Sequence, residues 1–180
     1  MMNGNKYQDI FLSRIDEIEK CLENGLYLAA LALALTLPDI CGCAEYPGEG
    51  TGVRYKGWYD QYIGVNEKPN DPYGADMAYL SDEVVYNLRN HFLHAGNPNI
   101  DKDEIKDELC KIDHFSLLIS DDVLGDTSSV SYGPNLCVTE RGYTVNTKLL
   151  CLRLCKAAKQ YYEDNKEKFT FFQYDIHEID

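Results

Sequence analysis

The stretch SDEVVYNLRNHFLHAGNP, residues 81–98, carries the start and stop signals of one helix and constrains the fold more than any other segment. Ser81 is a favourable N-cap because its hydroxyl can accept from an unpaired backbone N–H, and the two acidic residues that follow suit the positive end of the helix dipole. Gly96, with a proline two residues later, ends the pattern. We predict a helix from about Asp82 to His94.

The two faces of this predicted helix differ in chemistry. At about 100° per residue, one side of the helix is an apolar stripe that should face the core. It consists of Val84, Val85, Leu88 and Phe92. The other side carries Tyr86, Asn90, Leu93 and His94, with Arg89 on the border. A face that mixes a leucine with polar groups suits contact with a partner or a ligand, so this helix is the candidate site.

The polar side of the helix holds the two side-chain types that RNA cleavage by transesterification needs. A base must take the proton of the 2′-hydroxyl, and a cation must hold the charge of the phosphorane. Histidine titrates near neutrality, which suits His94 as the base, and the planar fork of Arg89 suits phosphate oxygens. The two positions lie about 140° apart around an ideal helix, so one copy should not bring them tightly together. Asn90, about 40° from His94, could orient its imidazole. The alternative is that these residues only cap and solvate a helix end.

Three segments carry a resemblance to a known family. They are LPDICGCAEYP at residues 37–47, RYKGWY at 54–59 and LRNHFLHAGN at 88–97. Together they resemble uncharacterised bacterial proteins with HEPN-like domains, and Arg89 to His94 resembles the R-x4-6-H motif of that superfamily, in which a polar residue follows the arginine. The resemblance covers residues 20–97.

The HEPN resemblance implies a function and an assembly. It implies an endoribonuclease that needs no metal or other cofactor, with Arg89, Asn90 and His94 as catalytic residues from each chain of a homodimer that forms through the 81–94 helix. It also implies a role in a defence or toxin system. In HEPN toxins that are paired with a nucleotidyltransferase, a modified tyrosine follows two residues after the histidine. Here Gly96 holds that position, so we do not expect that form of control.

Two other function classes stay open. The first is a non-catalytic HEPN-like module that binds a nucleotide or a partner protein. The second is a zinc protein whose ligands would be Cys41, Cys43, His91 and His94. The C-x-C spacing is not that of a zinc knuckle, so we expect no metal site.

Residues before the motif helix are candidates for substrate contacts. An aromatic wall on which unstacked bases could lie would comprise Arg54, Tyr55, Trp58 and Tyr59. The alternative is that these rings pack between helices. Asp39 follows Pro38, and we expect it to form a buried pair with the arginine of the motif helix or to cap a restarted helix.

Composition limits the partners. The chain has 180 residues, which suits one domain, and its net charge of −13 disfavours broad contact with nucleic-acid backbones, so DNA is not an expected partner. Seven cysteines without a disulfide spacing and an amphipathic start indicate a cytoplasmic protein. Residues 26–37 are apolar but too short to span a bilayer, which indicates a buried core helix and no membrane contact. One face of the last predicted helix is basic and is either a track for an acidic partner or an ordinary solvated face. It carries Lys148, Arg153, Lys156 and Lys159.

The predicted fold is a single domain over residues 1–180, mainly α with a small antiparallel β element. An HEPN-like antiparallel helical bundle would comprise a helical core at 5–97 and a helix at about 146–166. Between them, residues 111–145 should form a β-hairpin or a three-stranded sheet, with a tight turn at residues 140–142. The tail, residues 169–180, is acidic and aromatic and would add an edge strand or stay mobile.

Overall fold

The computed structural model describes residues 9–68 and 76–174. The helices of these residues are α1 (Ile10–Glu23), α2 (Tyr27–Ala34), α3 (Leu37–Glu45), α4 (Thr51–Tyr62), α5 (Asp82–Ala95) and α6 (Thr147–Asp164). The strands are β1 (His114–Leu118), β2 (Thr127–Tyr132) and β3 (Val138–Asn146). Short 3-10 turns lie at Gly64–Asn66, Lys102–Glu104, Glu108–Cys110, Pro134–Leu136 and Lys166–Phe169. The prediction of a mainly helical chain with a small sheet is confirmed.

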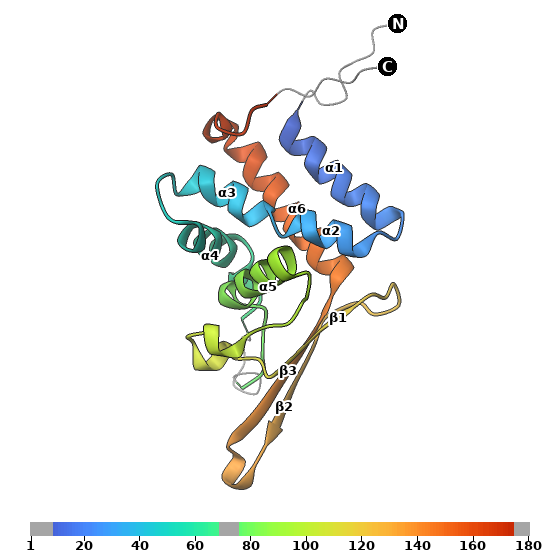
Figure 1. Ribbon diagram of the computed structural model, residues 1–180, viewed down its shortest axis with the longest axis vertical. Helices are drawn as coiled ribbons and strands as arrows, with labels where there is room; N and C mark the ends of the chain where they lie inside the picture. The colour runs from blue at the N-terminus through green and yellow to red at the C-terminus, as the bar shows by residue number, and fades with distance from the viewer. Residues whose placement is uncertain (1–8, 69–75, 175–180) are drawn as a thin grey trace, which may run out of the picture.

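The helices pack around α6, which crosses the middle of the bundle (Figure 1). The buried stripe of α1, spaced three and four residues apart, consists of Phe11, Ile15, Ile18 and Leu22. The matching stripe of α6 includes Leu150, Leu154, Ala158 and Tyr161. Burial of apolar stripes against one another is the main stabilising contribution here, at roughly 25 cal/mol per Å² of apolar surface. One core cluster extends from α1 to Phe169 and includes Tyr143 and Val145 of β3.

The apolar segment Tyr27–Glu45 is long and apolar enough to be considered as a membrane span, with half of it buried inside the protein. Two helices share this segment, because α2 ends at Ala34 and α3 begins at Leu37. Pro38 stands in the first turn of α3, where its missing N–H would have no helical partner in any case. Leu31, Leu35 and Leu37 are fully buried, so the segment serves as the core element that its composition predicts.

The sheet differs from the prediction in two ways. Its order is β1-β3-β2, and β1 pairs with β3 in parallel, so the sheet is mixed and not antiparallel. The predicted turn at residues 140–142 is wrong, because β3 runs unbroken from Val138 to Asn146 and the chain reverses at residues 133–137. A Cβ on Gly142 would lie 2.6 Å from Ser129 Oγ, so this glycine permits close approach of two strands and does not make a turn.

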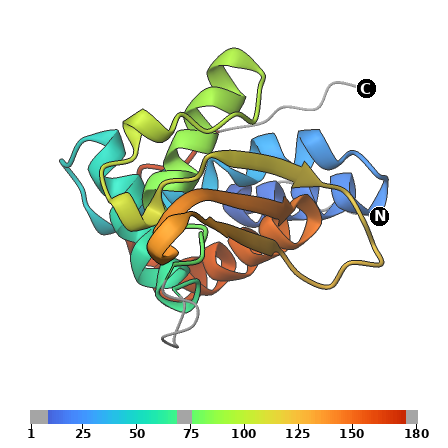
Figure 2. The same ribbon diagram turned by 90° about the horizontal axis from the view of Figure 1, so that it is seen from below.

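The β2–β3 hairpin extends away from the helical bundle (Figure 1), and viewed from below the strands lie in front of the helices (Figure 2). The described part of the tail, residues 169–174, contains no strand. It packs through Phe169, which is buried against Phe11 and Tyr162. The prediction for the end of the tail falls on residues 175–180, outside the described residues.

Candidate functional site

Helix α5 forms where its capping signals predict it. Ser81 Oγ accepts from the backbone N–H of Val84 at 3.3 Å, and Gly96 ends the helix in the left-handed region with φ 70°. Val84, Val85 and Leu88 are buried, so the predicted apolar stripe faces the core. His94 is therefore exposed, while Arg89 and Asn90 are half-buried.

Arg89, Asn90 and His94 meet within one chain. Arg89 Nη1 donates to Asn90 Oδ1 at 2.9 Å and lies 3.4 Å from His94 Nε2. A guanidinium can only donate, so in a hydrogen bond between these two groups His94 Nε2 is the acceptor. The expectation that one copy would not bring the two groups together is wrong, because the long Arg89 side chain spans the arc between the two positions.

Asp39 on α3 joins two arginines from different helices. Its Oδ1 accepts from Arg54 Nε at 2.8 Å, and its Oδ2 lies 3.8 Å from Arg89 Nη2. The predicted pairing of Asp39 with the motif arginine is thus confirmed, but the prediction that the pair is buried is wrong. The exposed fractions of the three side chains are 22%, 24% and 18%, so this ion pair is only partly shielded from water. We call Asp39, Arg54, Arg89, Asn90 and His94 the Arg89 cluster. Two guanidiniums against one carboxylate leave a local excess of positive charge in an acidic chain.

Close packing of α3 on α4 brings Asp39 to Arg54. A Cβ on Gly42 would lie 2.6 Å from the carbonyl oxygen of Arg54, a distance that side chains essentially never show. Gly42 therefore permits the backbones of the two helices to touch. The three segments that carry the HEPN resemblance form α3, α4 and α5, and all three contribute to the Arg89 cluster.

The prediction of an aromatic wall for base stacking on α4 is wrong. Tyr55, Trp58 and Tyr59 are completely buried, so none of them offers a face on which a base could stack. Tyr59 Oη donates to the Leu80 carbonyl at 3.0 Å, and burial raises the pKa of the Tyr55 hydroxyl far above its usual value. These rings pack between helices, as the alternative interpretation had it. Of the predicted wall, only Arg54 belongs to the site.

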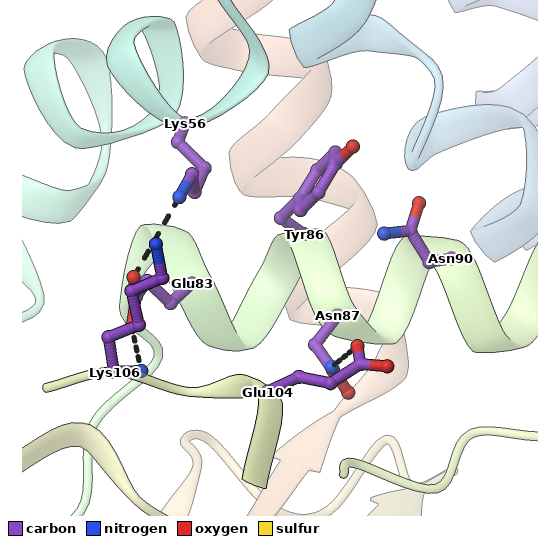
Figure 3. A pocket seen from close by; sticks show the side chains of 7 residues that line it. All are labelled: Lys56, Glu83, Tyr86, Asn87, Asn90, Glu104 and Lys106. Carbon is purple, nitrogen blue, oxygen red and sulfur yellow. Dashed lines mark hydrogen bonds and ion pairs between the residues drawn. The ribbon is translucent and has the colours of Figure 1, made fainter. Parts of the chain in front are cut away.

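A small pocket opens beside the cluster along α5, with a volume of about 120 Å³ (Figure 3). Its lining comprises Lys56, Glu83, Tyr86, Asn87, Asn90, Glu104 and Lys106. Asn87 is 3% exposed, and it donates to Glu104 Oε2 at 2.6 Å while accepting from the Asp101 N–H at 2.9 Å. Asn87 and Glu104 were missed from the sequence, although an asparagine one turn after Val84 on the buried stripe was a signal that a polar group is bound there.

The candidate zinc ligands suggested by the sequence do not form a metal site among the described residues. Among the described residues, no group of three or more His, Cys, Asp or Glu side chains could hold a metal ion. Of the four zinc candidates, Cys41 lies in the core, where burial raises the pKa of its thiol, and His91 lies 3.9 Å from Glu104.

The suggested basic track on α6 is interrupted by acidic partners. Arg153 Nη2 donates to Asp126 at 2.6 Å, and its Nη1 lies 3.2 Å from Glu67. Lys148 pairs with Asp121. Because two of its four cations are neutralised in this way, the track offers little positive charge to a phosphate backbone.

No protein-family model, curated protein or solved structure matches the chain. The HEPN resemblance of residues 20–97 therefore stays a prediction. The chemistry of the Arg89 cluster is independent of it.

Proposed function

We propose that the chain is an endoribonuclease of the HEPN type that cleaves RNA by 2′-hydroxyl transesterification without a metal. The observation that carries the proposal is the contact of Arg89 Nη1 with both Asn90 Oδ1 and His94 Nε2. It sets an exposed imidazole beside a fixed cation, and these are the base and the charge stabiliser that the reaction requires.

In this mechanism Arg89 receives the phosphate and His94 activates the nucleophile. The guanidinium donates to the phosphate oxygens, which frees His94 Nε2 to take the proton of the 2′-hydroxyl. The 2′-oxygen then forms a bond to phosphorus as the bond from phosphorus to the 5′-oxygen breaks. The products are a 2′,3′-cyclic phosphate and a 5′-hydroxyl. Asp39 on α3 holds Arg89 of α5 in place, and Arg54 of α4 in turn binds Asp39.

A homodimer through the 81–94 helix would complete the site. In an in-line displacement the attacking and leaving oxygens lie on opposite sides of phosphorus, so one histidine cannot serve both. We propose that His94 of a second copy, in its protonated form, donates a proton to the leaving 5′-oxygen. The outward face of α5, where His94 is exposed and Leu93 is half-buried, supports this contact because it is not used in the core of one chain.

The charge of the protein limits its substrate. A net charge of −13 opposes long contacts with a phosphate backbone, and the local positive excess is confined to the Arg89 cluster. We propose a short, single-stranded RNA segment as the substrate, and DNA is excluded because it lacks the attacking 2′-hydroxyl. All seven cysteines are free, which supports a reducing compartment, and we propose the cytoplasm.

His94→Ala tests the proposal. Cleavage of a fluorescently labelled RNA should fall by about 10²- to 10⁴-fold, the usual contribution of a general base. The melting temperature should change little, because His94 is exposed and, among the described residues, its one polar partner is Arg89. His114→Ala is the matched control, since the His114 side chain is 72% exposed and lies on β1. Equal cleavage by His94→Ala and wild type, or no cleavage by wild type of a broad RNA pool, refutes the proposal.

A second candidate is a non-catalytic module that binds a nucleotide. The pocket beside the Arg89 cluster favours it, because Tyr86, Asn90 and Glu104 in its lining could contact a ligand even if the cluster cleaves no RNA. Calorimetry with nucleotides, together with the cleavage assay, separates the two: a module binds the nucleotide and cuts no RNA.

A further inference from the structure

The pocket next to the Arg89 cluster has the size of a single planar ring system. Its volume of about 120 Å³ is well below the roughly 300–1,000 Å³ of sites for larger ligands. Asn90 belongs to both the pocket and the Arg89 cluster, so a ring in the pocket lies beside the atoms that would meet a phosphate. This inference rests on the proposed function for its link to cleavage.

Glu104 is the carboxylate that can accept from a ligand. Its Oε2 takes one bond from Asn87 Nδ2, and a carboxylate has about four lone-pair sites, so acceptor capacity remains. The Glu104 side chain is 57% exposed. The other carboxylate of the pocket, Glu83, is already engaged. Its Oε2 accepts from the backbone N–H groups of Lys106 at 2.7 Å and Asp107 at 3.3 Å, and its Oε1 lies 3.7 Å from the Lys56 ammonium.

Asn90 provides a donor. Its Oδ1 accepts from Arg89, which leaves the amide nitrogen for a ligand, and Figure 3 shows that nitrogen on the side toward Tyr86. Asn90 and Glu104 come from different segments, α5 and the turn at Lys102–Glu104. The pocket therefore joins a donor and an acceptor from two different segments of the chain.

Tyr86 supplies an aromatic face. Its ring lies 5.2 Å from the buried ring of Tyr55, and a Cβ on Gly52 would come within 3.2 Å of its hydroxyl. The ring is thus held between α4 and α5. A held aromatic face is a platform on which an unstacked base can lie.

We propose that this pocket binds guanine and selects the base next to the cleaved phosphate. Guanine places one acceptor, O6, beside two donors, N1–H and the N2 amino group. Asn90 Nδ2 would donate to O6, while the Glu104 carboxylate would accept from N1–H and N2–H. Adenine, cytosine and uracil do not carry this order of one acceptor followed by two donors, so each leaves part of the Asn90–Glu104 pair unsatisfied.

The cleavage arm of the test uses Glu104→Gln. This variant removes the charge and one acceptor but keeps an oxygen that can accept from Asn87. The substrates are RNAs that differ only in the base next to the cleaved phosphate. Wild type should cut the RNA with guanine at this position at least about tenfold faster than the RNAs with another base there. Glu104→Gln should reduce this preference to about twofold or less. Glu108→Gln, whose carboxylate is exposed and pairs with Lys111, should keep it. A wild-type enzyme without base preference, or an unchanged preference in Glu104→Gln, overturns the inference.

The binding arm does not require cleavage. His94→Ala should bind guanosine 5′-monophosphate at least about tenfold more tightly than the cytidine, adenosine or uridine monophosphates, as measured by calorimetry. Adding Tyr86→Ala should weaken that binding by about tenfold or more through the loss of stacking. If His94→Ala binds the guanosine monophosphate selectively but wild type cuts no RNA, the pocket is supported and the nuclease proposal is refuted. Equal binding of all four monophosphates refutes the pocket, whatever the cleavage assay shows.

Discussion

Asp39→Asn tests whether the carboxylate between the two arginines holds the Arg89 cluster together. The substitution keeps the shape of the side chain and one oxygen for Arg54, but it removes the negative charge between two guanidiniums. Loss of one partner from a fully buried ion pair costs about 3–5 kcal/mol, whereas exposed pairs contribute about 0–1 kcal/mol. With about a fifth of each side chain exposed, we expect a loss of about 1–3 kcal/mol in the free energy of unfolding.

The loss in stability sets the size of the thermal shift. A chain of this length loses about 2–4 °C of melting temperature per kcal/mol, so we expect a decrease of about 2–12 °C. Arg89 would also lose its link to α3. Displacement of a catalytic group by about 1 Å can cost about 100-fold in rate, so kcat for RNA cleavage should fall by about 10- to 100-fold. KM should change less, because the guanidinium itself remains.

Differential scanning fluorimetry and a steady-state cleavage assay measure the two effects on the same samples. Asp16→Asn is the matched control, because it makes the same chemical change at an exposed position of α1. The reasoning is refuted if Asp39→Asn melts with the control and cleaves RNA at the wild-type rate. The Asp39 carboxylate would then contribute neither to stability nor to cleavage.

Two further predictions concern packing and pH. Gly42→Ala forces a Cβ to within 2.6 Å of the Arg54 carbonyl and should lower the free energy of unfolding in urea by about 1–3 kcal/mol, while Gly125→Ala, where a Cβ meets nothing within 4 Å, should not. The Lys168 ammonium and the hydroxyl of Tyr161 lower the pKa of Glu45 from its ordinary 4.5, so its contribution to stability is present above that value and is lost as pH falls below it. Wild type should therefore be more stable than Glu45→Gln at pH 7 in urea, and the difference should shrink toward pH 3; a constant difference would contradict this account.

Local signals predicted α5 well because its ends are determined by nearby residues. Ser81, the acidic first turn and Gly96 act within one turn of the helix, and their effect does not depend on the rest of the fold. The approach of Asp39 to Arg89 was also predicted, since a lone acid and a lone arginine on packed helices need a partner. The contact between Arg89 and His94 was not predicted, because the ideal helical angle describes Cβ directions and takes no account of the reach of a long side chain.

The sheet was harder to predict because its pairing depends on distant residues. Glu140, Arg141 and Gly142 have turn-like composition, but Gly142 is required by the close approach of Ser129 in the neighbouring strand. The parallel pairing of β1 with β3 joins residues 28 apart in sequence, such as His114 and Gly142, and no local pattern specifies it. The pocket was missed for the same reason, since Asn87 and Glu104 meet across a loop.

The chemical nature of the RNA ends tests the central claim most directly. Wild-type protein should be incubated with a defined RNA in excess EDTA, with His94→Ala in parallel, and the products analysed by mass spectrometry. Transesterification by the Arg89 cluster predicts 2′,3′-cyclic phosphate and 5′-hydroxyl ends, formed in EDTA and lost in His94→Ala. Products with 5′-phosphate and 3′-hydroxyl ends, or cleavage that requires a divalent metal, would contradict it.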